Sequence, residues 1–214
     1  EPHVLLFPQP MSPKDRDTLC ATASLADVRR LPPPVGTLLA DAAAAIRMKL
    51  SPNDYWIPGG GSSPIGTLGF VEAAFELADQ IRRGDCPRPQ AVFVPLGSAG
   101  TAAGLALGFA LCDLAITVVG VRVVPQPVSS RPAVLALIAR TLHALRGPAR
   151  ALRDARFLPR AAKLLRIDNT HLGAGYAHPT AAAHEALATA QSHGLILETT
   201  YTGKAFAALL SRAS

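Results

Sequence analysis

The chain has 214 residues, of which 49% are hydrophobic, 17% charged and 5% aromatic, and its formal net charge is +6. A chain of this length and apolar content can bury a core in one large domain or two small ones, which excludes a largely disordered protein. No apolar run reaches the roughly 18 residues of a membrane-spanning helix, and the first residues show no basic segment followed by an apolar one, so we expect a soluble, cytoplasmic protein without a membrane partner.

Short apolar segments alternate with alanine-rich segments of helical periodicity. Before residue 90 this pattern predicts strands at 4–7 and 55–58 and helices at about 13–26, 35–48 and 66–83. Ser12 is placed to cap the first helix, and the Leu-Pro-Pro-Pro run at 31–34 interrupts the pattern after it. Such an alternation favours a sheet covered by helices.

The segment 91–124 contains the clearest supersecondary unit. It reads as a strand at 91–95, a loop at 96–101, a helix to about Leu111 and a strand at 116–124. A crossover of this kind is right-handed and makes its two strands parallel. We therefore predict an α/β fold with open, mostly parallel sheets and flanking helices.

Positive charge is concentrated between Arg131 and Arg166, where nine Arg or Lys residues accompany a single acid, Asp154. Apolar residues recur there at helical spacing, at Leu135, Ile138, Leu142 and Leu145. This spacing predicts an amphipathic helix whose basic residues face solvent. The segment lacks interleaved aromatic residues and any nucleic-acid-binding motif, so we expect no nucleic-acid partner; binding that weakened steeply with salt would support that alternative.

The last third of the chain combines turn-rich segments with helices. The LRID run at 165–168 precedes turn residues at 171–180 and a helix at 180–193, which Thr180 can cap and Gly194 can end. The tail from Leu195 predicts a strand, a short loop and a final helix.

Neither the cysteines nor the histidines indicate a metal site. The cysteines are widely spaced and odd in number, which favours a reducing compartment over a disulfide framework: Cys20, Cys86 and Cys112. Four histidines lie close in sequence without the spacing of a zinc site: His171, His178, His184 and His193.

The loop Gly97-Ser98-Ala99-Gly100-Thr101 lies between the strand and the helix of the clearest unit. Unpaired N–H groups at a helix N-terminus, together with the Ser98 and Thr101 hydroxyls, suit it to a phosphate. It matches neither a Walker A loop, nor GxGxxG, nor a nucleophile elbow, and a simple tight turn is an equal interpretation. Donor-rich loops at 59–64 and 200–204 would meet it at one sheet edge and could surround one ligand.

Four motifs, in this order, carry a resemblance that runs from about Leu5 to Leu210: IPGGGSSPIGTLGFVEAAFELADQI, FVPLGSAGTAAGLALG, GAGYAHPT and LETTYTGKAFAALL. They closely resemble the D-cysteine desulfhydrase and 1-aminocyclopropane-1-carboxylate deaminase family, whose members are pyridoxal-phosphate enzymes of the tryptophan synthase β-like fold (fold type II). The resemblance implies that residues 1–50 are the remainder of a smaller N-terminal α/β domain. It implies that 51–214 form the larger cofactor-binding domain, and that the chain is truncated at both ends.

The resemblance also implies roles for single residues. The cofactor phosphate would be bound by Gly97, Ser98, Ala99, Gly100 and Thr101. Thr202 would face the pyridine nitrogen, where desulfhydrases have Thr and deaminases have Glu, and Tyr176 and Tyr201 would do acid–base work or hold the substrate carboxylate. The family usually has glycine at the position of Ala99, a difference that matters if the position needs a positive φ.

The family's Schiff-base lysine is not among the lysines of this chain, which are Lys14, Lys49, Lys163 and Lys204. We expect that lysine upstream of Glu1 in a longer protein, because the whole motif that contains it is absent while the other loops are intact. The alternative is a noncatalytic homologue that binds pyridoxal phosphate or another phosphate ligand.

The resemblance therefore predicts a pyridoxal-phosphate-dependent lyase or deaminase that converts a small amino acid to a keto acid and ammonia by β-elimination, as D-cysteine desulfhydrase does. Thr202 favours this reaction over the alternative, opening of 1-aminocyclopropane-1-carboxylate, because a hydroxyl leaves the pyridine nitrogen neutral. The family also implies a homodimer.

Overall fold

The computed structural model describes residues 2–6, 13–30, 53–147 and 155–213. Contacts within the chain divide it into two units, Glu1–Pro58 and Gly59–Ser214. Each unit is described by itself below, and the assignment of cofactor binding to the second unit stays a prediction.

The first unit contains a two-stranded parallel sheet. Strand β1 (His3–Leu6) pairs with β2 (Asp27–Arg30), and helix α1 (Pro13–Ala23) connects them. β1 and α1 confirm predicted elements, although α1 ends before residue 26 because the chain turns there into β2, which the sequence pattern did not predict. The Ser12 cap and the helix predicted at 35–48 lie outside the described residues.

Two predicted strands are wrong. Residues 55–58 and 195–198 are not in a strand. Their apolar side chains are exposed, Ile57 to 68% and Ile196 to 98%. These runs are apolar enough to resemble strands, but no neighbouring strand pairs with them in the described ranges, and an unpaired extended segment is not a sheet.

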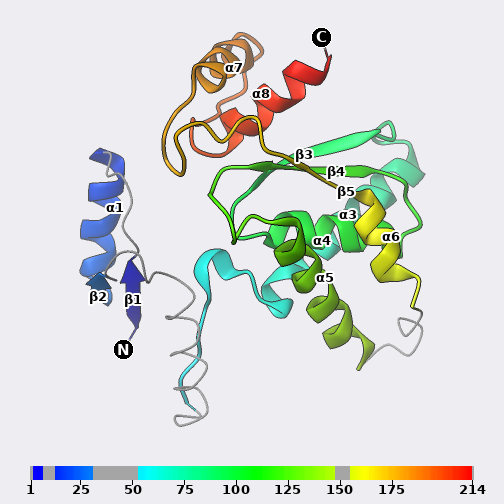
Figure 1. Ribbon diagram of the computed structural model, residues 1–214, viewed down its shortest axis with the longest axis horizontal. Coiled ribbons are helices and arrows are strands. Elements are labelled where there is room, and N and C mark those ends of the chain that lie inside the picture. Colours follow the sequence, from blue (N-terminus) through cyan, green and yellow to red (C-terminus); the bar gives the residue numbers. More distant parts are fainter. Residues whose placement is uncertain (1, 7–12, 31–52, 148–154, 214) are drawn as a thin grey trace. The chain divides into compact units, whose positions relative to one another are not determined.

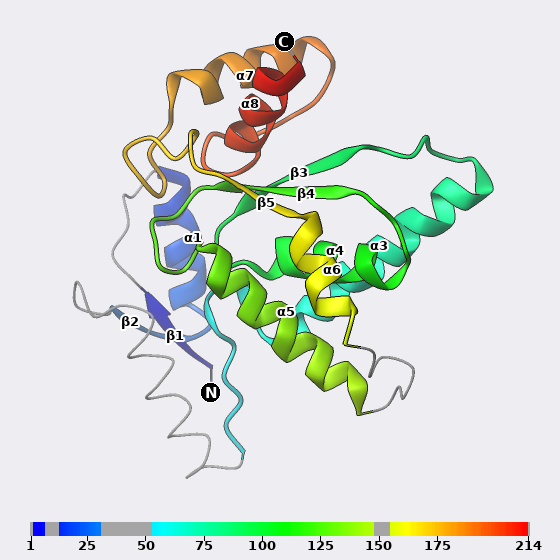
Figure 2. The same cartoon turned by 45° about the vertical axis from the view of Figure 1, so that its right-hand side comes forward.

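The second unit is built on a three-stranded parallel sheet (Figures 1 and 2). Its order is β3 (Ala91–Leu96), β4 (Thr117–Arg122) and β5 (Leu165–Asp168), with Ala91 opposite Thr117 and Val118 opposite Leu165. The predicted α/β class with parallel strands is confirmed. Parallel strands place the loops that follow their C-terminal ends along one edge of the sheet.

Helices cover both faces of this sheet (Figures 1 and 2). One face carries four helices: α3 (Pro64–Arg83), α4 (Gly100–Leu111), α5 (Arg131–Arg146) and α6 (Phe157–Leu164). The other face carries α8 (Thr202–Ala213), and α7 (Ala181–Ser192) packs against α8. Successive side chains of a strand point to opposite faces of the sheet, which explains this layering. Val118 of β4 packs into the core with α4, whereas Val119 and Val121 pack against α8, at Ala205 and Ala208.

The amphipathic helix predicted in the basic segment is α5. Its Ile138 and Leu142 are buried and its Arg140 is exposed, so the positive charge faces solvent as predicted. Among the helices in the described ranges, none is both long enough and apolar enough to span a membrane.

Candidate active site

The loop between β3 and α4 presents the N-terminus of α4, and the N-cap residue of this helix provides no side-chain cap. The N-cap of α4 is Ala99, and no side chain of this residue caps the helix. Three other helices of the same unit have a hydroxyl N-cap that accepts a backbone N–H: Ser63, Ser130 and Thr180. Apart from the Gly100 N–H, which Ser62 Oγ accepts, the first turn of α4 therefore keeps the N–H groups and partial positive charge that suit a phosphate.

Ala99 has φ 80° and ψ −14°, which is the left-handed region. This conformation directs the chain from β3 into α4 and is the one that glycine adopts without strain. The position of Ala99 thus does need a positive φ, and the alanine carries a backbone cost that a glycine would not.

Ser62 joins the 59–64 loop to this turn. Its Oγ donates a hydrogen bond to Ser98 Oγ at 2.8 Å and accepts one from the Gly100 N–H at 3.1 Å. A Cβ added at Gly60 would lie 2.1 Å from Ser98 Oγ, so the two loops touch closely. The sequence indicates that this loop is donor-rich but does not single out Ser62, whose place directly after three glycines is the available signal.

Tyr201 of the 200–204 loop lies beside Tyr176, which belongs to the segment between β5 and α7. The Tyr201 ring comes within 3.9 Å of where a Cβ on Gly97 would lie. The hydroxyls of Tyr176 and Tyr201 are 2.5 Å apart, and their rings pack edge to face with centroids 5.9 Å apart. Residues 201 and 176, which are expected to act on the substrate, therefore lie together beside the expected phosphate loop.

Glu198 organises the start of α8, where Thr202 is located. Its Oε1 accepts the N–H groups of Tyr201 and Thr202 at 2.7 Å each, and its Oε2 accepts that of Thr200 at 2.7 Å. Burial raises the pKa of the Glu198 carboxyl, but these donors and the Thr202 hydroxyl outweigh it, so the pKa lies below its ordinary value of 4.5. Thr202 Oγ1 also accepts the Glu198 N–H at 3.0 Å. Glu198 was not among the residues predicted for the site, although an acid four residues before Thr202 fits a helix N-terminus.

Two of the four histidines noted in the sequence have local partners. His171 Nδ1 lies 3.2 Å from Asp168 Oδ1, and His193 Nδ1 lies 3.0 Å from the Thr189 carbonyl. Within the described part of the chain no group of three or more His, Cys, Asp or Glu side chains could hold a metal ion.

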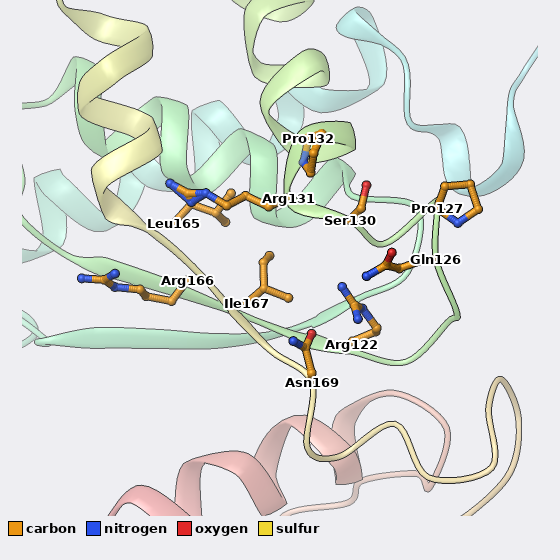
Figure 3. A pocket seen from close by; sticks show the side chains of 10 residues that line it. All are labelled: Arg122, Gln126, Pro127, Ser130, Arg131, Pro132, Leu165, Arg166, Ile167 and Asn169. Carbon is orange, nitrogen blue, oxygen red and sulfur yellow. The ribbon is translucent and has the colours of Figure 1, made fainter.

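A separate cavity of about 610 Å³ lies beside β5 and the first turn of α5 (Figure 3). Its lining includes Arg122, Arg131 and Arg166 and no acidic residue. Arg122 donates to the Ser129 carbonyl and Arg131 to the Ala162 carbonyl. None of the residues expected to bind the cofactor lines this cavity.

Comparisons with known proteins agree with the fold and the motifs. The sequence profile of the family described as "Pyridoxal-phosphate dependent enzyme" matches residues 3–214. The chain is 35% identical over 160 residues to D-cysteine desulfhydrase from Klebsiella pneumoniae subsp. pneumoniae, a match that covers 73% of this chain and 44% of that protein. It is 34% identical over 157 residues to D-cysteine desulfhydrase from Salmonella newport, with the same coverage of 73% and 44%.

A solved structure described as an analysis of "the ACC deaminase homologue" superimposes with a TM-score of 0.68 at 24% identity, over 98% of this chain and 60% of that one. This likeness shows the tryptophan synthase β-like fold. The chain spans less than half the length of the curated relatives that it matches. The profile match over nearly the whole chain shows that the protein belongs to the family of pyridoxal-phosphate-dependent enzymes.

Proposed function

We propose that the complete protein eliminates hydrosulfide from the β-carbon of a small amino acid such as D-cysteine and releases a keto acid and ammonia. The observation that carries the proposal is the position of Tyr201, which contacts Tyr176 and lies beside Gly97 of the expected phosphate loop. The D-cysteine desulfhydrases to which the chain is similar support the choice of substrate.

The residues around the loop fit the phosphate of pyridoxal phosphate. Ala99 provides no side-chain cap for the first turn of α4, and Ser62 Oγ, which accepts the Gly100 N–H, donates to Ser98 Oγ beside this turn. These neutral donors would bind the phosphate together with Thr101. The bound cofactor supplies an electron-withdrawing ring that stabilises negative charge on the substrate Cα.

The tyrosines would move or hold protons at the substrate. Their hydroxyls share one short hydrogen bond, so either phenol can donate while the other accepts. Such a pair can hold a proton near the substrate carboxylate or near the departing sulfur. We propose Tyr176 and Tyr201 as these catalytic groups.

Thr202 would set the electronic character of the site. A hydroxyl facing the pyridine nitrogen leaves that nitrogen neutral, whereas a carboxylate would keep it protonated. The weaker electron withdrawal is sufficient when a good leaving group departs from the β-carbon, and it disfavours opening of a cyclopropane ring.

The decisive experiment uses the complete reading frame with added pyridoxal phosphate. Hydrosulfide and keto acid are measured with D-cysteine, L-cysteine and 1-aminocyclopropane-1-carboxylate, and the cofactor is then fixed with borohydride and mapped. We expect equal amounts of hydrosulfide and keto acid from D-cysteine, with the cofactor on a lysine upstream of Glu1. Turnover of the cyclopropane substrate alone would contradict the elimination, and failure to fix any cofactor would support a noncatalytic binder.

A substitution at Thr202 tests the electronic role. Thr202→Glu places a carboxylate at the pyridine nitrogen and also beside Glu198, whose Oε1 is 3.1 Å from Thr202 Oγ1. We expect a shifted absorption spectrum of the bound cofactor and about tenfold lower hydrosulfide release. Thr202→Gln is the matched control, because it has the same shape without the charge. Equal kinetics for the wild type and Thr202→Glu would remove Thr202 from the mechanism.

A further inference from the structure

Lys204 is a charged side chain with no exposed surface. Taking an ammonium group out of water is costly unless strong acceptors replace the water. Burial accordingly lowers the pKa of the Lys204 ammonium, and the charge of Glu198 opposes this shift. A charged group that is buried at such a cost in free energy, in the same helix as Thr202, calls for a specific role.

The ammonium binds two backbone carbonyls of one loop. Nζ donates to the Leu172 oxygen at 2.8 Å and to the Gly175 oxygen at 3.2 Å. Both carbonyls belong to the segment 169–179, which connects β5 to α7. Gly175 directly precedes Tyr176, so one bond of Lys204 ends on the peptide group that carries the Tyr176 nitrogen.

The first turn of α8 and the residue directly before it contact both ends of Tyr176. Tyr201 meets the Tyr176 hydroxyl, while Lys204 binds the carbonyl next to the Tyr176 backbone. Glu198 in turn holds the N–H groups of this turn. Tyr176 is therefore held at its hydroxyl by Tyr201 and next to its backbone nitrogen by Lys204.

We propose that Lys204 is a positioning residue whose bonds to the 172 and 175 carbonyls hold the Tyr176 phenol against Tyr201. The importance of this contact for turnover rests on the proposed function, whereas the contact itself does not. Lys204 acts through the loop and not on the substrate, because its donors point to carbonyls of the chain.

The geometric claim is tested by ¹⁹F NMR of the complete protein labelled with 3-fluorotyrosine. The Tyr201 signal is assigned with Tyr201→Phe, and Tyr176→Phe gives its position when the partner hydroxyl is absent. We expect Lys204→Met to move the Tyr201 signal at least half of the way to its position in Tyr176→Phe. Lys163→Met removes an exposed lysine of α6 and is the control, in which the Tyr201 signal should not move. An unmoved signal in folded Lys204→Met would overturn the proposal.

The wild type provides a test that does not depend on folding of the variants. The contact of Lys204 Nζ with the Leu172 and Gly175 carbonyl oxygens, at 2.8 and 3.2 Å, should give a measurable scalar coupling through the hydrogen bonds between the isotope-labelled ammonium nitrogen and these carbonyl carbons. A folded wild type without this coupling would contradict the arrangement.

Kinetics test the functional half. If the enzyme turns over D-cysteine, Lys204→Met should lower kcat about 10–100-fold, as expected for a misplaced catalytic group. In the Tyr176→Phe background, Lys204→Met should lower kcat less than about twofold, because Tyr176, through which Lys204 acts, is already altered. Equal losses in both backgrounds would mean that Lys204 only stabilises the fold. Absence of any turnover would defeat the proposed function alone, since the NMR result does not require the reaction.

Discussion

Ala99 combines a left-handed backbone with a side chain. A Cβ in this region costs roughly 1 kcal/mol relative to glycine, which adopts it freely. The N–H groups that would bind phosphate are the same in either residue. The substitution of the usual glycine should therefore affect stability more than cofactor binding.

Ala99→Gly should raise the free energy of unfolding by about 0.5–1 kcal/mol, because relief of strain exceeds the extra freedom of glycine in the unfolded chain. Urea unfolding measures this change. Ala102→Gly, in the helical and buried part of α4, is the control and should lower stability by about 1–2 kcal/mol, through lower helix propensity and the loss of a buried methyl group. A loss of stability in Ala99→Gly similar to that in the control would show that position 99 carries no strain.

Gly60 has φ 67° and lies against Ser98, so it brings the 59–64 loop onto the phosphate loop. Gly60→Ala should displace the Ser98 side chain, whose Cβ would be 2.7 Å from the added methyl. We expect pyridoxal phosphate affinity to fall about tenfold, the loss of roughly one good hydrogen bond.

Gly61→Ala separates strain from the clash, because Gly61 has φ 66° but nothing within 4 Å of an added Cβ. Cofactor affinity, measured by fluorescence titration, should stay within about twofold of the wild type in this control. Equal losses in the two variants would mean that contact with Ser98 is unimportant.

At the scale of elements, α4 is the central helix of its layer and packs closely on α3. A Cβ at Gly108 would lie 2.4 Å from the Ala74 Cβ and 2.9 Å from the Val71 carbonyl of α3. The absent side chain allows the two backbones to approach, and this fixes the orientation of the helix whose N-terminus forms the phosphate loop. The packing of α4 thus links the core to the site.

Gly108→Ala should lower the free energy of unfolding by about 1–3 kcal/mol, because neither backbone can move away without disturbing the core. Gly69→Ala in α3 is a matched control on an exposed helical position with open space around it. It should stabilise the protein by about 0.5–1 kcal/mol through helix propensity. Thermal unfolding measures the stability of both variants, and a Gly108→Ala variant more stable than the wild type would contradict the close packing of α3 and α4.

At the scale of the whole molecule, acid should unfold the protein by protonating two structural carboxylates. Burial raises the pKa values of Asp168 and Glu198, but their hydrogen bonds, from Thr170 and His171 to Asp168 and from the α8 backbone to Glu198, lower both below the ordinary values of 3.8 and 4.5. The unfolded chain therefore binds more protons than the native one in this range, and stability falls as pH decreases from about 4.5 through the native pKa values.

Glu198→Gln tests this directly by denaturant unfolding between pH 7 and pH 3. The variant should be less stable than the wild type at pH 7, and the difference should shrink as pH falls, because the wild-type carboxyl becomes neutral too. A difference that stays constant over this range would show that ionised Glu198 does not stabilise α8.

Periodicity and caps predicted most elements of the second unit, because these signals are local. They correctly predicted β3, β4 and the helix that Thr180 caps. β2 was missed because its sequence, Asp-Val-Arg-Arg, is polar and its pairing depends on a distant strand. Conversely, 195–198 has the composition of a strand but no partner in the described ranges.

The sequence predicts only those parts of the site that a motif marks. Glycines and hydroxyls indicated the loop at 97–101, and the family resemblance provided the roles of Thr202 and the tyrosines, which stay predictions. The contacts of Ser62 with Ser98 and of Lys204 with Gly175 join residues that are 36 and 29 positions apart. No local pattern encodes such contacts, because they depend on how whole elements pack.

The contacts made at the start of α8 also constrain the number of residues between 198 and 204. Tyr201, directly before α8, contacts Tyr176, while Thr202 and Lys204 in the first turn contact Glu198 and the Gly175 carbonyl. Inserting one residue in this turn would rotate everything after it by about 100° and shift it by about 1.5 Å. Natural variation should therefore change residue types between 198 and 204 more readily than it changes their number, and an insertion here should be more damaging than any single substitution.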